Sequence, residues 1–138
     1  MKYKKFIFAT LVYVIITMAL AMPWHFIFFK DLYHNLGIYN REPLIIPLGL
    51  ASVIIQGVVL AYFYPLFYKG GKPIWQGMKF GLIMGVFLFS VSTLANAAKI
   101  EVTSMSTWIL IQTAFHAIQF ILTGAGIGLV YGKNAKSS

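Results

Sequence analysis

The sequence predicts an all-α integral membrane protein, with one domain over residues 1–138 folded as a four-helix transmembrane bundle. Of its 138 residues, 59% are hydrophobic and only 10% are charged, whereas soluble domains carry about 25% charged residues. Four apolar stretches reach the length of about 20 residues that a helix needs to cross a bilayer. The sequence lacks the ten-residue units of alternating polarity that indicate a membrane β-barrel.

The four predicted spans cover residues 6–29, 44–68, 74–98 and 105–131. They are separated by the polar or helix-breaking segments KDLYHNLGIYNREP, KGGKP and KIEVTS. The first span has a rival interpretation, because MKYKK, an apolar run and the sequence ALA at 19–21 together resemble a signal peptide. Pro23 follows closely and residues 24–29 stay apolar, so we expect the span to remain uncleaved.

Positive charge is distributed unequally between the two ends of the predicted bundle. One end collects Lys2, Lys4, Lys5, Lys69, Lys72, Lys79, Lys133 and Lys136. At the other end, three cations are offset by three carboxylates. Short cytoplasmic loops retain Lys and Arg, so both termini are expected in the cytoplasm. Because the basic residues lie beside apolar spans, we expect anionic lipid headgroups as their partner, and no nucleic acid.

Aromatic and small residues predict how the helices are anchored and packed. Indole rings favour the membrane–water interface, which makes interface anchors of Trp24, Trp75 and Trp108. The third and fourth spans each carry glycines four residues apart, on one helix face, at Gly77, Gly81 and Gly85 and at Gly124, Gly128 and Gly132. Such faces let helices approach closely in lipid. They could pack within the chain, form a homodimer, receive a helix of a partner membrane protein, or form a groove for a lipid or sterol.

Polar residues within the spans are the best functional clue, because they are costly in hydrocarbon. The fourth span places four of them, Gln112, His116, Gln119 and Thr123, in one stripe away from its glycine face, so we expect this helix to be the most enclosed of the four. The candidate pocket residues, mostly in the outer half of the bundle, are His25, Gln56, Ser92, Asn96, Gln112, His116 and Gln119. They could line a pocket open to the outside, or only join helices by hydrogen bonds.

Several kinds of chemistry are excluded or disfavoured. The chain has no cysteine, which removes thiolate catalysis and cysteine-ligated metal sites. No carboxylate lies within a span and no Ser–His–Asp spacing suggests a triad, so we assign no catalytic residue. His25 and His116 are expected to differ in depth by about 9 Å, too far for comfortable ligation of one metal ion. We therefore predict no metal site and no cofactor.

Two segments resemble a known group of proteins. These are PWHFIFFKDLYHNLGIYNREPLIIPLG and the later STLANAAK…AFHAIQF…GIGLVYGK. With them the chain resembles small bacterial four-span integral membrane proteins of unknown function, over nearly its whole length. The resemblance implies a bacterial inner (cytoplasmic) membrane location and supplies no catalytic residue.

The leading functional hypothesis is a non-enzymatic membrane protein that binds or passes an unknown small ligand through an outward-facing polar pocket. The alternative is an accessory protein whose glycine faces pack against a partner helix. A membrane enzyme and a haem- or metal-binding protein are further alternatives. The sequence identifies neither the ligand nor the oligomeric state.

Overall fold

The computed structural model describes residues 2–133, and these contain helices and no strand. Five α-helices and two π-helical segments follow one another as α1 (Lys2–Pro23), η1 (Trp24–Phe28), α2 (Lys30–Asn35), α3 (Ile46–Phe67), α4 (Pro73–Phe89), η2 (Ser90–Ala95) and α5 (Met105–Tyr131). Four continuous helices are long and apolar enough to cross a membrane: Lys2–Phe28, Ile46–Phe67, Pro73–Ala95 and Met105–Tyr131. The predicted all-α, multi-pass helical bundle is confirmed, with span ends shifted by a few residues.

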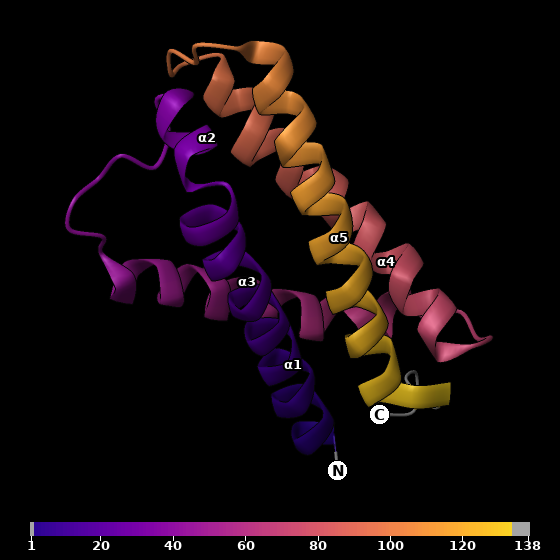
Figure 1. Cartoon of the computed structure of the whole chain (residues 1–138). Coiled ribbons are helices and arrows are strands. Elements are labelled where there is room, and N and C mark those ends of the chain that lie inside the picture. The colour runs from indigo at the N-terminus through magenta and orange to yellow at the C-terminus, as the bar shows by residue number, and fades with distance from the viewer. Residues whose placement is uncertain (1, 134–138) are drawn as a thin grey trace.

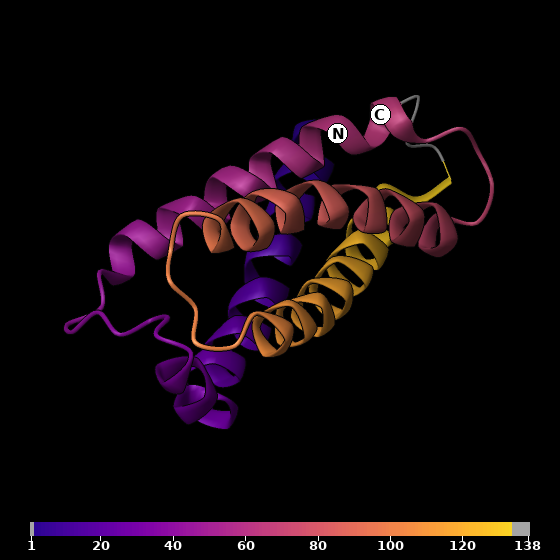
Figure 2. The ribbon, with the colours of Figure 1, turned by 90° about the horizontal axis from the view of Figure 1, so that it is seen from above.

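Three of the long helices run roughly up and down the bundle, and α3 crosses them (Figure 1). The interface between α4 and α5 is the most extensive, while α1 contacts both α3 and α5. Seen from above, α3 and α5 lie on opposite sides of α4 (Figure 2). The first ten residues of α3 are nearly all exposed, so its outer half diverges from the bundle.

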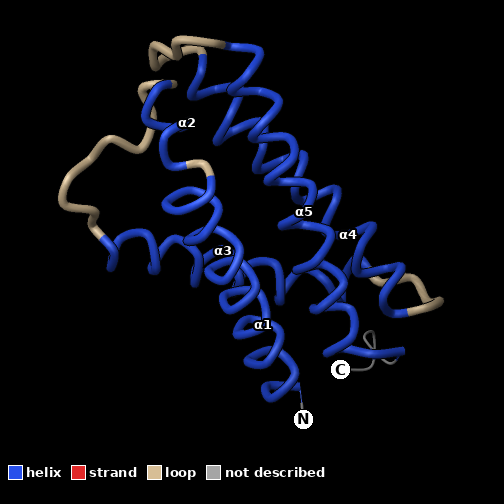
Figure 3. The backbone as a smooth tube through the Cα atoms, in the orientation of Figure 1, coloured by secondary structure: helices blue, strands red, loops and turns tan. Residues whose placement is uncertain are grey.

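The positions of the helix ends agree with the prediction that the lysine-rich segments lie at one end of the bundle. The start of α1, the start of α4 and the end of α5 gather at one end of the bundle, opposite the connection between α4 and α5 (Figure 1). The loops lie mainly at the ends of the helices, and the longest joins α2 to α3 (Figure 3). Lys136, which contributes to the predicted charge asymmetry, lies outside the described residues.

The glycine faces of α4 and α5 pack against each other. A methyl group on Gly77 would overlap the carbonyl oxygen of Gly124, and one on Gly124 would overlap that of Gly77. Gly128 lies equally close to the backbone of Pro73. The two helix backbones are therefore in direct contact, and this contact occupies the surface that a partner helix would need.

Gly132 does not belong to this interface. Nothing lies within 4 Å of the position of its missing Cβ, and its φ is +69°. A positive φ is readily adopted by glycine, and the residue directly follows the last residue of α5. The prediction that Gly132 packs helices is wrong, because it ends the helix instead.

Helix α5 is the most enclosed of the four, as its polar stripe and glycine face predict. In its most apolar window 39% of the residues are buried, against 17–22% for the other three helices. It contributes to both clusters of buried side chains, a larger one around Tyr13, Tyr64 and Phe120 and an outer one around Tyr33 and Trp108. The short helix α2 covers the outer end of the bundle and supplies Tyr33 to the outer cluster.

Candidate functional site

A cavity of about 210 Å³ lies between the four long helices, and we call it the central cavity. Six of the seven predicted pocket residues line it: His25, Gln56, Ser92, Gln112, His116 and Gln119. Among the described residues that line it, none is Asp, Glu, Lys or Arg. The seventh, Asn96, does not line this cavity but lines a neighbouring one together with Ser92. The fold thus brings polar residues from distant parts of the chain into one uncharged site.

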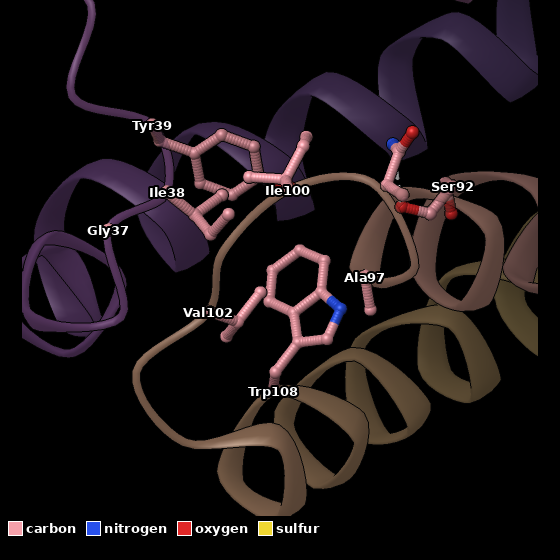
Figure 4. A pocket seen from close by; sticks show the side chains of 9 residues that line it. Gly37, Ile38, Tyr39, Ser92, Ala97, Ile100, Val102 and Trp108 are labelled. Carbon is pink, nitrogen blue, oxygen red and sulfur yellow. Dashed lines mark hydrogen bonds between the residues drawn. The ribbon is translucent and has the colours of Figure 1, made fainter.

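That neighbouring cavity, the outer cavity, has a volume of about 310 Å³. Tyr39 and Trp108 line it together with apolar residues near the outer ends of α4 and α5, and Ser92 lies across from them (Figure 4). Ser92 and Tyr39 line both the outer and the central cavity. The two cavities therefore adjoin at these two side chains.

His116 is held by two hydrogen bonds in the wall of the central cavity. Its Nδ1 lies 2.9 Å from the carbonyl oxygen of Gln112, and its Nε2 lies 3.0 Å from the hydroxyl oxygen of Ser92. A carbonyl oxygen can only accept, so we assign the proton of the neutral imidazole to Nδ1. Nε2 then accepts the hydroxyl proton of Ser92.

His25 lies in η1, the π-helical turn that follows Pro23. Its ring is close to those of Phe115, Tyr33 and Tyr39, with centroid distances of 4.5, 4.9 and 5.0 Å. Among the described residues, its Nδ1 is the one buried side-chain nitrogen or oxygen without a hydrogen-bond partner. The sequence left open whether His25 lines a pocket or only joins helices, and the structure places it in the cavity wall.

The inner end of the cavity is closed by hydrogen bonds that meet at Tyr13. Its hydroxyl donates to Oε1 of Gln56 at 2.7 Å and accepts from Nε2 of Gln119 at 3.3 Å. The same Nε2 lies 3.4 Å from the hydroxyl of Thr17, and Gln56 also donates to Ser52 at 3.0 Å. The sequence analysis missed Tyr13, although a tyrosine in the middle of an apolar span is a signal for a buried hydrogen-bond partner.

The outer end is tied together through Gln112. The hydroxyl of Tyr33 donates to its Oε1 at 2.8 Å and accepts from Nε1 of Trp24 at 3.1 Å. Burial raises the pKa of Tyr33, and its hydrogen bond with Trp24 acts in the opposite direction. Tyr33 therefore remains protonated, and able to donate, at neutral pH.

The predicted interface anchors have different environments. Trp108 is only 2% exposed, and its Nε1 donates to the carbonyl oxygen of Thr93 at 3.2 Å. The prediction that it anchors the protein at the lipid interface is wrong, because α2 and the adjoining loops cover it. Trp24 is half-buried and bonded to Tyr33, whereas Trp75 is 58% exposed near the start of α4.

Tyr39, which the sequence analysis did not select as a pocket residue, lies at the entrance. It has a φ of 60°, an uncommon and strained conformation for a bulky side chain. It lines the central cavity, the outer cavity and a third cavity of about 430 Å³, which we call the vestibule. The vestibule is lined by His25 and by the charged Lys30, Arg41 and Glu42. These three charged residues do not line the central cavity.

An apolar groove of about 420 Å³ runs between α4 and α5. Val86, Phe89 and Ala117 line it, and it shares His116 and Phe120 with the central cavity. His116 thus separates an uncharged polar cavity from an apolar surface.

No group of three His, Cys, Asp or Glu side chains within residues 2–133 is placed to hold a metal ion. Comparison with protein-family models, curated protein sequences and solved structures finds no match for this chain.

Proposed function

We propose that the protein binds a small uncharged polar molecule, or the uncharged polar part of a larger one, in the central cavity. The observation that carries the proposal is that six polar side chains from α1–η1, α3, η2 and α5 line one cavity without a charged neighbour. A charged ligand would lose its hydration without gaining a counter-ion there. An amide, ester or hydroxyl group would exchange hydrogen bonds with water for hydrogen bonds with these side chains.

The unpartnered Nδ1 of His25 supports binding over simple packing. A buried polar group without a partner costs about 1–3 kcal/mol, and such groups need an explanation in a well-packed protein. Gln56, Gln119 and His116 already have partners, so interhelical bonding explains them and leaves His25 unexplained. A ligand that bonds to His25 would supply the missing partner.

Size and shape narrow the ligand class. A volume of about 210 Å³ is below the range of about 300–1,000 Å³ that is typical of pockets for drug-sized ligands. The rings of His25 and Phe115 line the cavity on one side, and they suit a flat or apolar body. The proposed ligand is thus a compact group with one or two hydrogen-bonding atoms.

We infer the membrane setting from the charge pattern and the resemblance together. Eight lysines at one end favour the bacterial cytoplasmic membrane with both termini inside, beside anionic headgroups. The central cavity then opens outward. Fusion of a periplasm-dependent phosphatase to the C-terminus should give no activity, and fusion after residue 40 should give high activity; the opposite pattern would reverse the orientation.

The accessory-protein alternative has less support. The glycine faces that would receive a partner helix are occupied by each other, since α4 and α5 touch backbone to backbone. A homodimer or partner would have to use another surface, and this remains a prediction without a supporting contact.

Ligand binding is tested with three probes of nearly one shape: benzamide, benzoate and benzylamine. In nanodiscs, benzamide should raise the melting temperature, while the anion and the cation should not. At 100 times the dissociation constant, the stabilisation should be about 2.7 kcal/mol. His25→Phe should abolish the shift, and His34→Phe, at an exposed position on α2, should retain it. Equal shifts with all three probes, or none, would contradict the proposal.

A further inference from the structure

Ser92 and His116 lie where three spaces meet. Ser92 lines the outer and central cavities, and His116 lines the central cavity and the apolar groove. Their side chains are joined by the 3.0 Å contact between Oγ and Nε2. A molecule that bridges the groove and the cavities therefore has to pass this pair.

The pair has the geometry of a nucleophile and its general base. With the proton of His116 on Nδ1, Nε2 is free to take the hydroxyl proton of Ser92. The carbonyl oxygen of Gln112, 2.9 Å from Nδ1, fixes the tautomer and the ring orientation. In a Ser–His–Asp triad, a carboxylate has this orienting role.

The backbone around Ser92 holds the hydroxyl in place. Ser92 belongs to η2, a π-helical segment, and such segments occur frequently at functional sites. Its carbonyl oxygen accepts a bond of 2.9 Å from the Asn96 side chain. Because both its backbone and its hydroxyl are bonded, Ser92 is positioned before any ligand arrives.

We propose that Ser92 and His116 cleave an acyl ester of a membrane lipid, with the acyl chain in the apolar groove and the ester in the central cavity. The proposal rests on the proposed function, because the ester is the uncharged polar group that the cavity would bind. The groove offers an apolar site of about 420 Å³ beside His116. The outer cavity adjoins Ser92 and provides the way out for the alcohol and the way in for water.

The reaction requires water as its one co-reactant. Oγ of Ser92 forms a bond to the ester carbonyl carbon while Nε2 of His116 takes the hydroxyl proton. The carbon–oxygen bond to the alcohol then breaks, and His116 returns the proton to the leaving oxygen. Water attacks the acyl-serine and gives a proton to His116; His116 passes this proton to Oγ of Ser92 as the bond to the acyl carbon breaks and the carboxylic acid is released.

The free nitrogen of His25 has a place in this scheme. It lines the same cavity and lacks a partner. Nδ1 is buried under the rings of Phe115, Tyr33 and Tyr39, so these rings have to move before it can donate to the negative oxygen that develops on the carbonyl. Stabilisation of such an oxyanion is a large part of catalysis by serine enzymes.

The test uses hexadecyl fluorophosphonate, which forms a stable bond to an activated serine, on the full chain in nanodiscs. Mass spectrometry of the peptides should place the adduct on Ser92. His116→Phe should slow labelling by at least about 100-fold, the lower range for loss of a general base. Ser106→Ala, an exposed serine at the start of α5, should label as the wild type does.

Each outcome decides the proposal. An adduct on Ser92 together with release of 4-nitrophenol from 4-nitrophenyl dodecanoate, faster than from the acetate, supports it. No adduct on Ser92 overturns it, and benzamide binding would then show that the cavity binds without reacting. Because the adduct is located in the wild type, the result holds even if Ser92→Ala fails to fold.

Discussion

The substitution Gly81→Ala measures how closely α4 and α5 pack. An added methyl group would overlap the carbonyl oxygen of Phe120 and lie 3.0 Å from Cα of Gly124. Both obstacles are backbone atoms, so no side-chain rotation can relieve the overlap and the helices must separate. Overpacking costs about 1–3 kcal/mol, and alanine recovers up to about 1 kcal/mol of helix propensity. If the overpacking cost is near the upper end of its range, about 3 kcal/mol, the free energy of unfolding falls by a net amount of about 2 kcal/mol.

The matched control is Gly49→Ala on α3. Nothing lies within 4 Å of its missing Cβ, so only the propensity gain of up to about 1 kcal/mol remains. Reversible unfolding of both variants by sodium dodecyl sulfate in mixed micelles gives the two free energies. Equal stability of Gly81→Ala and wild type would refute the direct backbone contact.

Three further predictions concern the outer end of the site. Gln112→Leu leaves the buried Tyr33 hydroxyl without its acceptor, so the free energy of unfolding should fall by about 1–3 kcal/mol; a double-mutant cycle with Tyr33→Phe that shows no coupling would contradict this. Tyr39→Gly removes the strain at a φ of 60° and removes the ring between the vestibule and the central cavity. The association rate of benzamide, measured by stopped flow, should therefore increase, and an unchanged association rate would exclude a gating role for Tyr39. Because burial raises the pKa of Tyr33 above its ordinary 10, the folded state favours the neutral phenol. Its stabilising effect is complete below pH 10 and is lost as the pH rises through the higher pKa of the folded state, so Tyr33→Phe should flatten the pH dependence of unfolding, and an equal slope in both proteins would contradict the assignment.

The number of long apolar helices and the enclosed face of α5 follow from the sequence because they depend on local composition and on residue spacing along one helix, whereas the short helix α2 lies in a segment predicted as a break. The predicted polar stripe on α5 contains Gln112, His116, Gln119 and Thr123; the first three line the central cavity, whereas the hydroxyl of Thr123 donates to the backbone carbonyl of Gln119. Gln56 and Ser92 join them from other helices, as their depth predicts. Spacing along single helices was therefore enough to find most of the candidate site.

The parts that were missed depend on how separate segments meet. Trp108 has the sequence context of an interface anchor, and only the position of α2 over it makes it buried. Tyr39 belongs to a polar loop, and its approach to His25 follows from the path of the chain after α2. The π-helical turns at residues 24–28 and 90–95 change the helix register, and no residue pattern used above predicts them.

The central claim is that the site is a water-accessible cavity open to the outside, and cysteine modification tests it most directly. The chain has no cysteine, so Ser92→Cys provides a single thiol in the cavity wall and Val91→Cys a matched thiol on the exposed, apolar side of the same segment. A membrane-impermeant methanethiosulfonate applied from the outside should modify Ser92→Cys much faster than Val91→Cys, and benzamide should slow the reaction. Equal rates at the two positions, without protection by benzamide, would contradict the account.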